Sequence, residues 1–260
     1  MEYLLVCSVA LFVSGLTLFS GFGLGTLLMP AFALFFPLPV AIAATAAVHL
    51  ANNLFKVVLV GKHADWGVVA RFAIPGALAA VLGALALHLF ANLPPLGTYR
   101  LGSQLHAIMP VKLVIGGLIV GFAVLELLPN PSRLTFDRRY LIPGGLLSGF
   151  FGGLSGNQGA FRAAFLLRAG LSKEGFVATG TVAAVIVDCA RLLVYGLSFY
   201  SSALRGAATV GPLVAAATLA AFLGALVGRR LLKKITLAGL QRLVGTLLVM
   251  VGLGLAAGLI

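Results

Sequence analysis

The sequence predicts an all-α polytopic membrane protein, and three observations lead to this fold class. Of the 260 residues, 61% are hydrophobic and only 9% are charged, whereas about a quarter of the residues in soluble domains are charged. Apolar stretches follow one another along nearly the whole chain, and about 20 apolar residues suffice for one helical crossing. These stretches are continuous and lack the apolar–polar alternation of a membrane β-barrel. The chain is therefore expected to span the membrane as helices.

Breaks at glycine, proline and charged clusters divide the chain into ten apolar segments. They are expected at residues 3–20, 26–36, 39–60, 67–91, 111–128, 140–156, 159–169, 172–197, 204–228 and 238–259. The first segment lacks the positive region and cleavage site of a signal peptide, so it is predicted to be a retained helix. Segments 26–36 and 159–169 are too short to cross alone and are expected to be half-helices or re-entrant hairpins.

The two halves of the chain show a weak internal repeat. At an offset of 135 residues, residues of similar chemical type align: Gly21 with Gly156, Asn53 with Asp188, Lys56 with Arg191, and Gly61 with Gly196. This alignment predicts a first membrane repeat at 1–128, an inter-repeat loop at 129–139 and a second membrane repeat at 140–260. Because each half has five segments, an odd number, the second repeat is expected to be inverted in the membrane.

The basic residues favour ten segments with both termini outside the cytoplasm. Lys56 and Arg191 lie within apolar segments, which leaves sixteen of the eighteen basic residues to assign to a side. If both short segments cross, twelve fall on one face and four on the other, whereas hairpins would give ten and six. The larger bias agrees better with the excess of Lys and Arg on the cytoplasmic side of membrane proteins. The twelve are Lys62, Arg71, Arg133, Arg138, Arg139, Arg168, Lys173, Arg229, Arg230, Lys233, Lys234 and Arg242, and the four are Arg100, Lys112, Arg162 and Arg205.

Other classes of protein are less consistent with this sequence. The net charge of +12 comes from basic residues scattered among short connections, so no nucleic-acid partner is expected. Cys7 and Cys189 lie in apolar segments without metal-ligand spacing, and no nucleotide-binding motif is present. The sequence therefore predicts no cofactor and no metal. An intramembrane enzyme is a minor alternative, because the sequence contains neither a Ser–His pattern typical of a nucleophile and its base nor a His–Glu pattern typical of a catalytic metal site.

Glycine-rich breaks in each half are the first candidate site. Gly21, Gly23 and Gly25 precede the short segment 26–36, where bent backbone and a half-helix N-terminus can hold an anion. Close helix packing is an equally good explanation of these glycines.

The equivalent break in the second half is more polar. Its candidate substrate-binding residues are Ser155, Gly156, Asn157, Gln158 and Arg162. Such polarity inside apolar sequence is expensive in lipid and usually faces a cavity. A lining role is therefore favoured over an exposed loop.

Two polar clusters inside apolar segments form the second candidate site. They consist of His49, Asn52, Asn53 and Lys56 in the third segment, and Asp188 and Arg191 in the eighth. Lys56 has no acidic residue within a helical turn, so it is the stronger candidate for holding an anion, although its stem could instead reach the interface. Asp188 could neutralise Arg191 or act as a proton-coupling group.

Three stretches resemble the sulfite exporter TauE/SafE family: GFGLGTLLMP at 21–30, PVAIAAT at 39–45 and GLSGNQGAFRAAFLLRAGLSKEGFVATGT at 153–181. The resemblance extends over nearly the whole chain as two related halves. It assigns family positions to Gly21, Gly23, Gly25, Pro30, Thr45, Gly153, Gly156, Gly159, Thr179 and Thr181. The chain differs from a glycine-only second motif at Asn157 and Gln158.

The resemblance implies a transporter of sulfite, a sulfonate or a related organosulfur or organic anion in the cell inner membrane. The mechanism expected from the residues is alternating access, with one repeat rocking against the other. The anion would be held by helix breaks, the hydroxyls of Thr45 and Thr179, and a base from Lys56 or Arg191. The alternatives are an anion channel or a membrane subunit of a larger complex. The expected partners are a small anion and the lipid bilayer; the oligomeric state is open, with a homodimer as one alternative.

Overall fold

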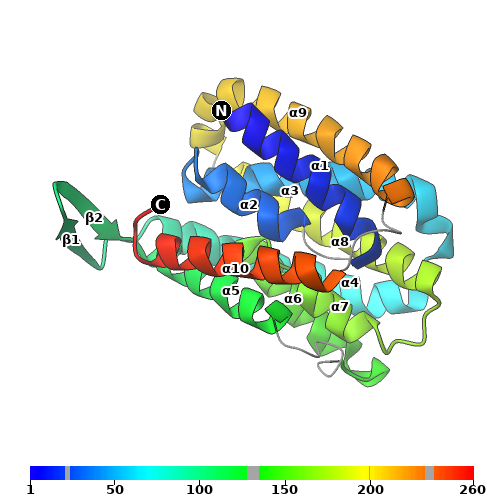
Figure 1. Ribbon diagram of the computed structural model, residues 1–260. Helices are drawn as coiled ribbons and strands as arrows, with labels where there is room; N and C mark the ends of the chain where they lie inside the picture. The colour runs from blue at the N-terminus through cyan, green and yellow to red at the C-terminus, as the bar shows by residue number, and fades with distance from the viewer. Residues whose placement is uncertain (21–23, 128–134, 199, 232–236) are drawn as a thin grey trace.

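The computed structural model describes residues 1–20, 24–127, 135–198, 200–231 and 237–260 (Figure 1). Within these residues the chain forms ten α-helices and one β-hairpin. The helices are α1 (Glu2–Ser20), α2 (Leu24–Ala33), α3 (Leu38–Val60), α4 (Trp66–Ala91), α5 (Pro110–Leu127), α6 (Leu141–Ser155), α7 (Gly159–Leu166), α8 (Lys173–Ser198), α9 (Tyr200–Leu231) and α10 (Leu237–Ala256). Short 3-10 helices, η1 (Gly61–His63) and η3 (Arg138–Tyr140), precede α4 and α6. The prediction of ten helical segments is confirmed.

The hairpin was not predicted from the sequence. Its strands, β1 (Gly97–Leu101) and β2 (Gln104–Ile108), pair antiparallel between α4 and α5. Gly102 has a φ of 62° in the two-residue turn, a conformation that glycine adopts readily. The β-forming residues around this turn are few, so their signal is weak beside the long apolar runs on either side.

Helix length separates full crossings from half-crossings. Helix α4 and the stretches Leu38–His63, Lys173–Leu197 and Val210–Val227 are long and apolar enough to cross a membrane. Helices α2 and α7 contain 10 and 8 residues, so at about 1.5 Å per residue they extend roughly 15 Å and 12 Å. Each spans half or less of a hydrocarbon core of about 30 Å. The chain is therefore a multi-pass helical membrane protein with two half-length helices.

Packing joins helices from opposite halves of the sequence. Helix α1 packs against α9, α4 against α6 and α8, α3 against α8 and α9, and α5 against α10. One hydrophobic cluster joins α1, α2, α3 and α9, and a second joins α4, α6, α7 and α8. A third cluster brings α5 and α10 against both groups. We call the first two groups the α1 bundle and the α4 bundle.

A seam of glycines lets α4 and α6 pack closely. A Cβ atom added at Gly149 would lie 1.9 Å from the carbonyl oxygen of Gly76. Cβ atoms added at Gly145 and Gly153 would each lie 2.1 Å from α4 carbonyl oxygens. The four-residue spacing places these α6 glycines on one face, the small-residue pattern typical of close transmembrane packing.

Both termini lie at one end of the helical body (Figure 1). At this end the Tyr99 hydroxyl of the hairpin donates a 2.7 Å hydrogen bond to the carbonyl of Ala257. At the other end, the Asp65 amide donates to the Thr179 hydroxyl oxygen at 3.0 Å, and the Asp65 carboxylate lies 3.9 Å from the Arg138 guanidinium. The start of α4 is thus tied to the start of α8 and to the connection between the two halves.

Candidate functional site

Helix α3 carries a buried polar stripe. Its members are Thr45, His49, Asn52, Asn53 and Lys56, which are all buried. Spacings of three and four residues place them on one helix face, over about 16 Å of helix length. The side chain of Asn52 accepts a 3.0 Å hydrogen bond from Ser14 of α1. This face is therefore covered by protein and not by lipid.

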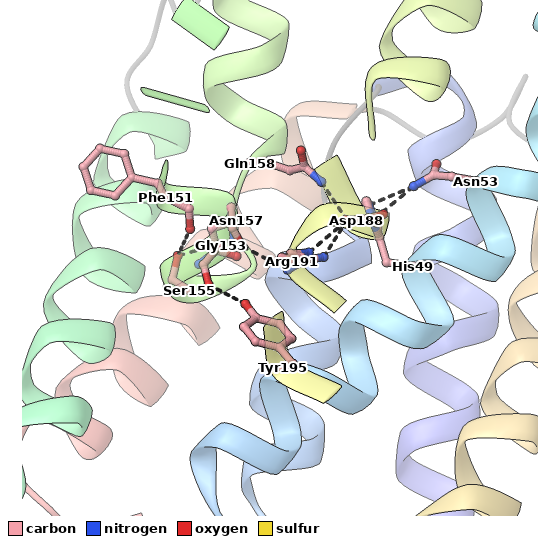
Figure 2. A network of polar contacts seen from close by, with 11 residues as sticks. His49, Asn53, Phe151, Gly153, Ser155, Asn157, Gln158, Asp188, Arg191 and Tyr195 are labelled. Carbon is pink, nitrogen blue, oxygen red and sulfur yellow. Dashed lines mark hydrogen bonds and ion pairs between the residues drawn. The ribbon is translucent and has the colours of Figure 1, made fainter. Parts of the chain in front are cut away.

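Asp188 of α8 is the centre of a hydrogen-bond network that joins α3, α8 and the α6–α7 break (Figure 2). His49 Nδ1 lies 2.6 Å from Asp188 Oδ2. Gln158 Nε2 and Arg191 Nε donate to Asp188 Oδ1 at 2.9 Å and 3.0 Å. Because both carboxylate oxygens have partners, the network offsets the large desolvation cost of a fully buried charge. The interpretation that Asp188 neutralises Arg191 agrees with this geometry.

Helix α8 also holds the end of α6. Arg191 donates a 3.0 Å hydrogen bond to the carbonyl of Gly152, and the Tyr195 hydroxyl donates to the carbonyl of Gly153. These carbonyls belong to the last turn of α6, where a nearby cation is favourable; the Gly152 carbonyl also accepts from the Gly156 backbone amide at 2.9 Å. The chain then turns at Gly156, which has a φ of 81°. The position of the break is thus set by side chains of α8.

The two helix breaks approach each other at Gly25. A Cβ atom added there would lie 2.9 Å from the carbonyl oxygen of Gly156. Gly21 and Gly23 lie outside the described residues. At Gly25 the close-packing explanation of the glycine therefore holds, and it brings the start of α2 against the α6–α7 break.

The polar residues of the α6–α7 break are buried. The Ser155 hydroxyl donates to the carbonyl of Phe151 at 2.9 Å and accepts from the backbone N–H of Asn157 at 3.4 Å. The Asn157 side chain is only 3% exposed, and neither its amide nitrogen nor its oxygen has a hydrogen-bond partner among the described residues. The Thr45 hydroxyl on α3 is in the same situation. Buried polar atoms normally have partners, so both side chains retain unused capacity to bind a polar ligand.

Basic side chains outnumber acidic ones among the described residues of this buried region. Lys56 is 6% exposed and Arg162 is 5% exposed, and the two interact electrostatically with each other. Arg162 also interacts with Asp188 and Arg191. The buried ionisable groups among the described side chains are thus three strong bases, Lys56, Arg162 and Arg191, and one carboxylate, Asp188, together with His49. Burial argues against the interfacial position considered for Lys56, and Arg162 is likewise not in an exposed connection.

The structure separates one expected site residue from the network, adds Tyr195 and gives His49 a defined partner. The Thr179 hydroxyl oxygen is engaged by Asp65 at the η1 end of the bundle. His49 and Tyr195 belong to the network; His49 was part of the predicted cluster on the third segment without a role of its own, and Tyr195 was not part of the predicted site. A histidine inside an apolar segment was the available signal for His49, but its partner lies 139 residues away. Tyr195 carried no such signal because an interfacial tyrosine is common in membrane helices.

Fold and site together define a polytopic helical membrane protein with broken helices and a buried group of basic side chains around the central network. Among the described residues, no group of His, Cys, Asp and Glu could hold a metal ion. Residues 3–255 match the family described as Sulfite exporter TauE/SafE, and the chain belongs to this family. Comparisons with curated proteins and with solved structures gave no match. The protein is thus a multi-pass membrane protein of a transporter family.

Proposed function

We propose that this protein is a secondary transporter that carries a small anion across the inner membrane by alternating access. The anion is sulfite, a sulfonate or a related organosulfur or organic anion. One observation carries this proposal: three basic side chains, Lys56, Arg162 and Arg191, are buried, and Asp188 is the one buried carboxylate among the described residues. Excess charge is costly away from water, and a bound anion would offset it.

Helix boundaries support two repeats, at 1–128 and 140–260, joined by the loop 129–139. Helices α1 and α6 end at Ser20 and Ser155, which differ by 135 in number. The same difference separates the first residues of α2 and α7, and those of α3 and α8. The packing agrees with the repeat. If α1 is equivalent to α6 and α4 to α9, the contact of α1 with α9 is equivalent to the contact of α6 with α4. A two-fold relation of this kind is common in secondary transporters.

The moving units proposed for alternating access are the α1 bundle and the α4 bundle. Each bundle has its own hydrophobic cluster and combines helices from both repeats. A repeat that moved as a whole would have to separate α4 from α6 and α1 from α9. The α1 and α4 bundles meet where α3 packs on α8, at the contact between His49 and Asp188. The central network therefore lies between the two proposed units.

Both termini are proposed to lie outside the cytoplasm. Lys62, Arg71, Arg138 and Lys173 are at or near the end of the bundle opposite the termini, and this end is then cytoplasmic by the positive-inside rule. A reporter fused after Ile260 should be active only if it functions outside the cytoplasm. Strong activity of a cytoplasm-dependent reporter at the same position would contradict this orientation.

The function is tested by thermal stabilisation of the purified protein with sulfite, thiosulfate, taurine, sulfoacetate and simple carboxylates. Binding to the folded form raises the unfolding temperature by mass action. Lys56→Met should weaken binding of the effective anion by roughly tenfold or more, as expected for a hydrogen bond to a charged group. Asn157→Leu should also weaken binding but leave the unliganded protein as stable as before, since the replaced atoms have no partner among the described residues.

Lys62→Met is the matched control because Lys62 is an exposed lysine on η1. Equal stabilisation in the Lys56→Met and Lys62→Met variants would remove Lys56 from the site. A flat response of the unmodified protein to every anion, with no flux in proteoliposomes, would contradict the transport proposal. Saturable counterflow of a labelled anion would distinguish a carrier from a channel.

A further inference from the structure

We propose that His49 takes up a proton when the anion binds and releases it when the anion leaves, so that anion and proton cross the membrane together. This inference rests on the proposed anion transport. The sequence suggested Asp188 for the coupling role. In the structure, Asp188 is fully buried and both of its oxygens have partners, including the permanent charge of Arg191. Asp188 is therefore a fixed counter-charge, and we assign the change of protonation to His49 beside it.

The geometry of His49 allows it to change charge without losing this neighbour. Nδ1 lies 2.6 Å from Asp188 Oδ2 and can donate to the carboxylate in both the neutral and the protonated imidazole. The second proton then goes to Nε2. The Asn53 side-chain nitrogen lies 3.3 Å from this atom and 3.1 Å from Nδ1. The Asn53 amide can donate to neutral Nε2 and, after rotation, accept from the protonated form. His49 retains an exposed fraction of 8%, whereas Asp188 and Arg191 have none.

The charges that face His49 come from three helices and act in opposite directions. Asp188 of α8 favours the protonated imidazole, and Arg191 of α8 and Arg162 of α7 oppose it. Lys56 lies two turns further along α3 and interacts with Arg162. Helix α2 and the part of α9 at 210–227 contribute no ionisable side chain. The protonation state of His49 thus depends first on its burial, which opposes the charged imidazole, and then on the balance between one carboxylate and several cations.

An anion that binds among these cations shifts the balance towards protonation. Its negative charge offsets the repulsion from Arg162 and Arg191, so proton affinity and anion affinity rise together. Such coupling is reciprocal, because the proton must strengthen anion binding by the same factor. Lower pH should therefore tighten anion binding, by up to about tenfold per pH unit within the range where histidine titrates.

Thiosulfate is a suitable probe because its charge is constant between about pH 5 and about pH 8, a range that includes the ordinary titration of histidine and extends below it, since burial opposes the charged imidazole. Its dissociation constant is measured across this range for the unmodified protein, for His49→Gln and for the matched control His63→Gln. His63 lies exposed on η1. The unmodified protein and the control should bind about tenfold or more tightly at the lower pH, and His49→Gln should show a flat profile.

Proton uptake is measured on the unmodified protein by calorimetry of thiosulfate binding in buffers with different ionisation enthalpies. About one proton taken up per anion near neutral pH is expected from the linkage. No proton uptake, or a steep pH profile that persists in His49→Gln, would overturn the assignment to His49. If thiosulfate exchange in proteoliposomes is present but independent of pH, only the coupling fails. If neither binding nor exchange of the tested anions occurs, the proposed function fails with it.

Discussion

Replacing Gly149 with leucine is expected to prevent α4 and α6 from packing and to leave little folded protein. Even a Cβ atom at this position would lie 1.9 Å from the carbonyl oxygen of Gly76. The obstacle is backbone, so no side-chain rotation can remove it. Overpacking in protein cores usually costs about 1–3 kcal/mol, and a change that forces two helices apart should reach or exceed the upper end. The measurement is the unfolding midpoint, or the folded yield, in detergent.

Gly117→Leu is the control for this prediction. Gly117 is also a helix-interior glycine, but no atom lies within 4 Å of a Cβ added there. Leucine has the higher helix propensity, so this variant should be as stable as the unmodified protein or slightly more stable. Equal midpoints for the two variants would mean that the glycine seam does not hold α4 against α6.

Asp188→Asn is expected to destabilise the protein by about 3–5 kcal/mol, the cost of removing one partner from a buried ion pair. The loss leaves the Arg191 guanidinium, which is fully buried, without its carboxylate. His49 loses its charged partner at the same time. The unfolding midpoint should therefore fall markedly even though asparagine preserves the size of the side chain.

The double variant Asp188→Asn with Arg191→Gln separates charge imbalance from shape. Removing both charges together should recover most of the stability, because a buried pair contributes little net stability compared with neutral residues of similar volume. If the single variant is as stable as the unmodified protein, or if the double variant is no better than the single one, Asp188 and Arg191 do not form the expected pair.

Much of the fold was predictable because helix breaks leave strong local signals. Gly156 and the charged connection before α6 mark ends that the structure also shows. Which helices pack against each other could not be predicted in this way. The contact of α1 with α9 depends on which small and apolar faces match in three dimensions, and apolar segments that differ little in composition do not reveal this.

The residues of the candidate site were predictable from the sequence, but the contacts between them were not. Lys56, Asp188 and Arg191 stand out as charges inside apolar segments, and all three are buried. The approach of His49 to Asp188 could not be read from spacing because the two residues are on different helices. Asn157 was recognisable as a polar residue at a break. That its side-chain amide has no hydrogen-bond partner among the described residues becomes apparent only from the structure.

The packing of early helices against late helices has a consequence for the insertion of the newly synthesised protein into the membrane. His49 emerges from the ribosome 139 residues before Asp188, a delay of roughly 7–30 s at about 5–20 residues per second. During this time α3 must stay in the bilayer with a lysine whose insertion costs about 2.5–3.5 kcal/mol and with a histidine that lacks its carboxylate. Newly inserted α3 therefore needs temporary contacts for its polar side chains at the insertion site until α8 has been synthesised and inserted. Substitutions in α8 should consequently increase degradation of newly made chains, an effect that a transport assay on surviving molecules would overlook.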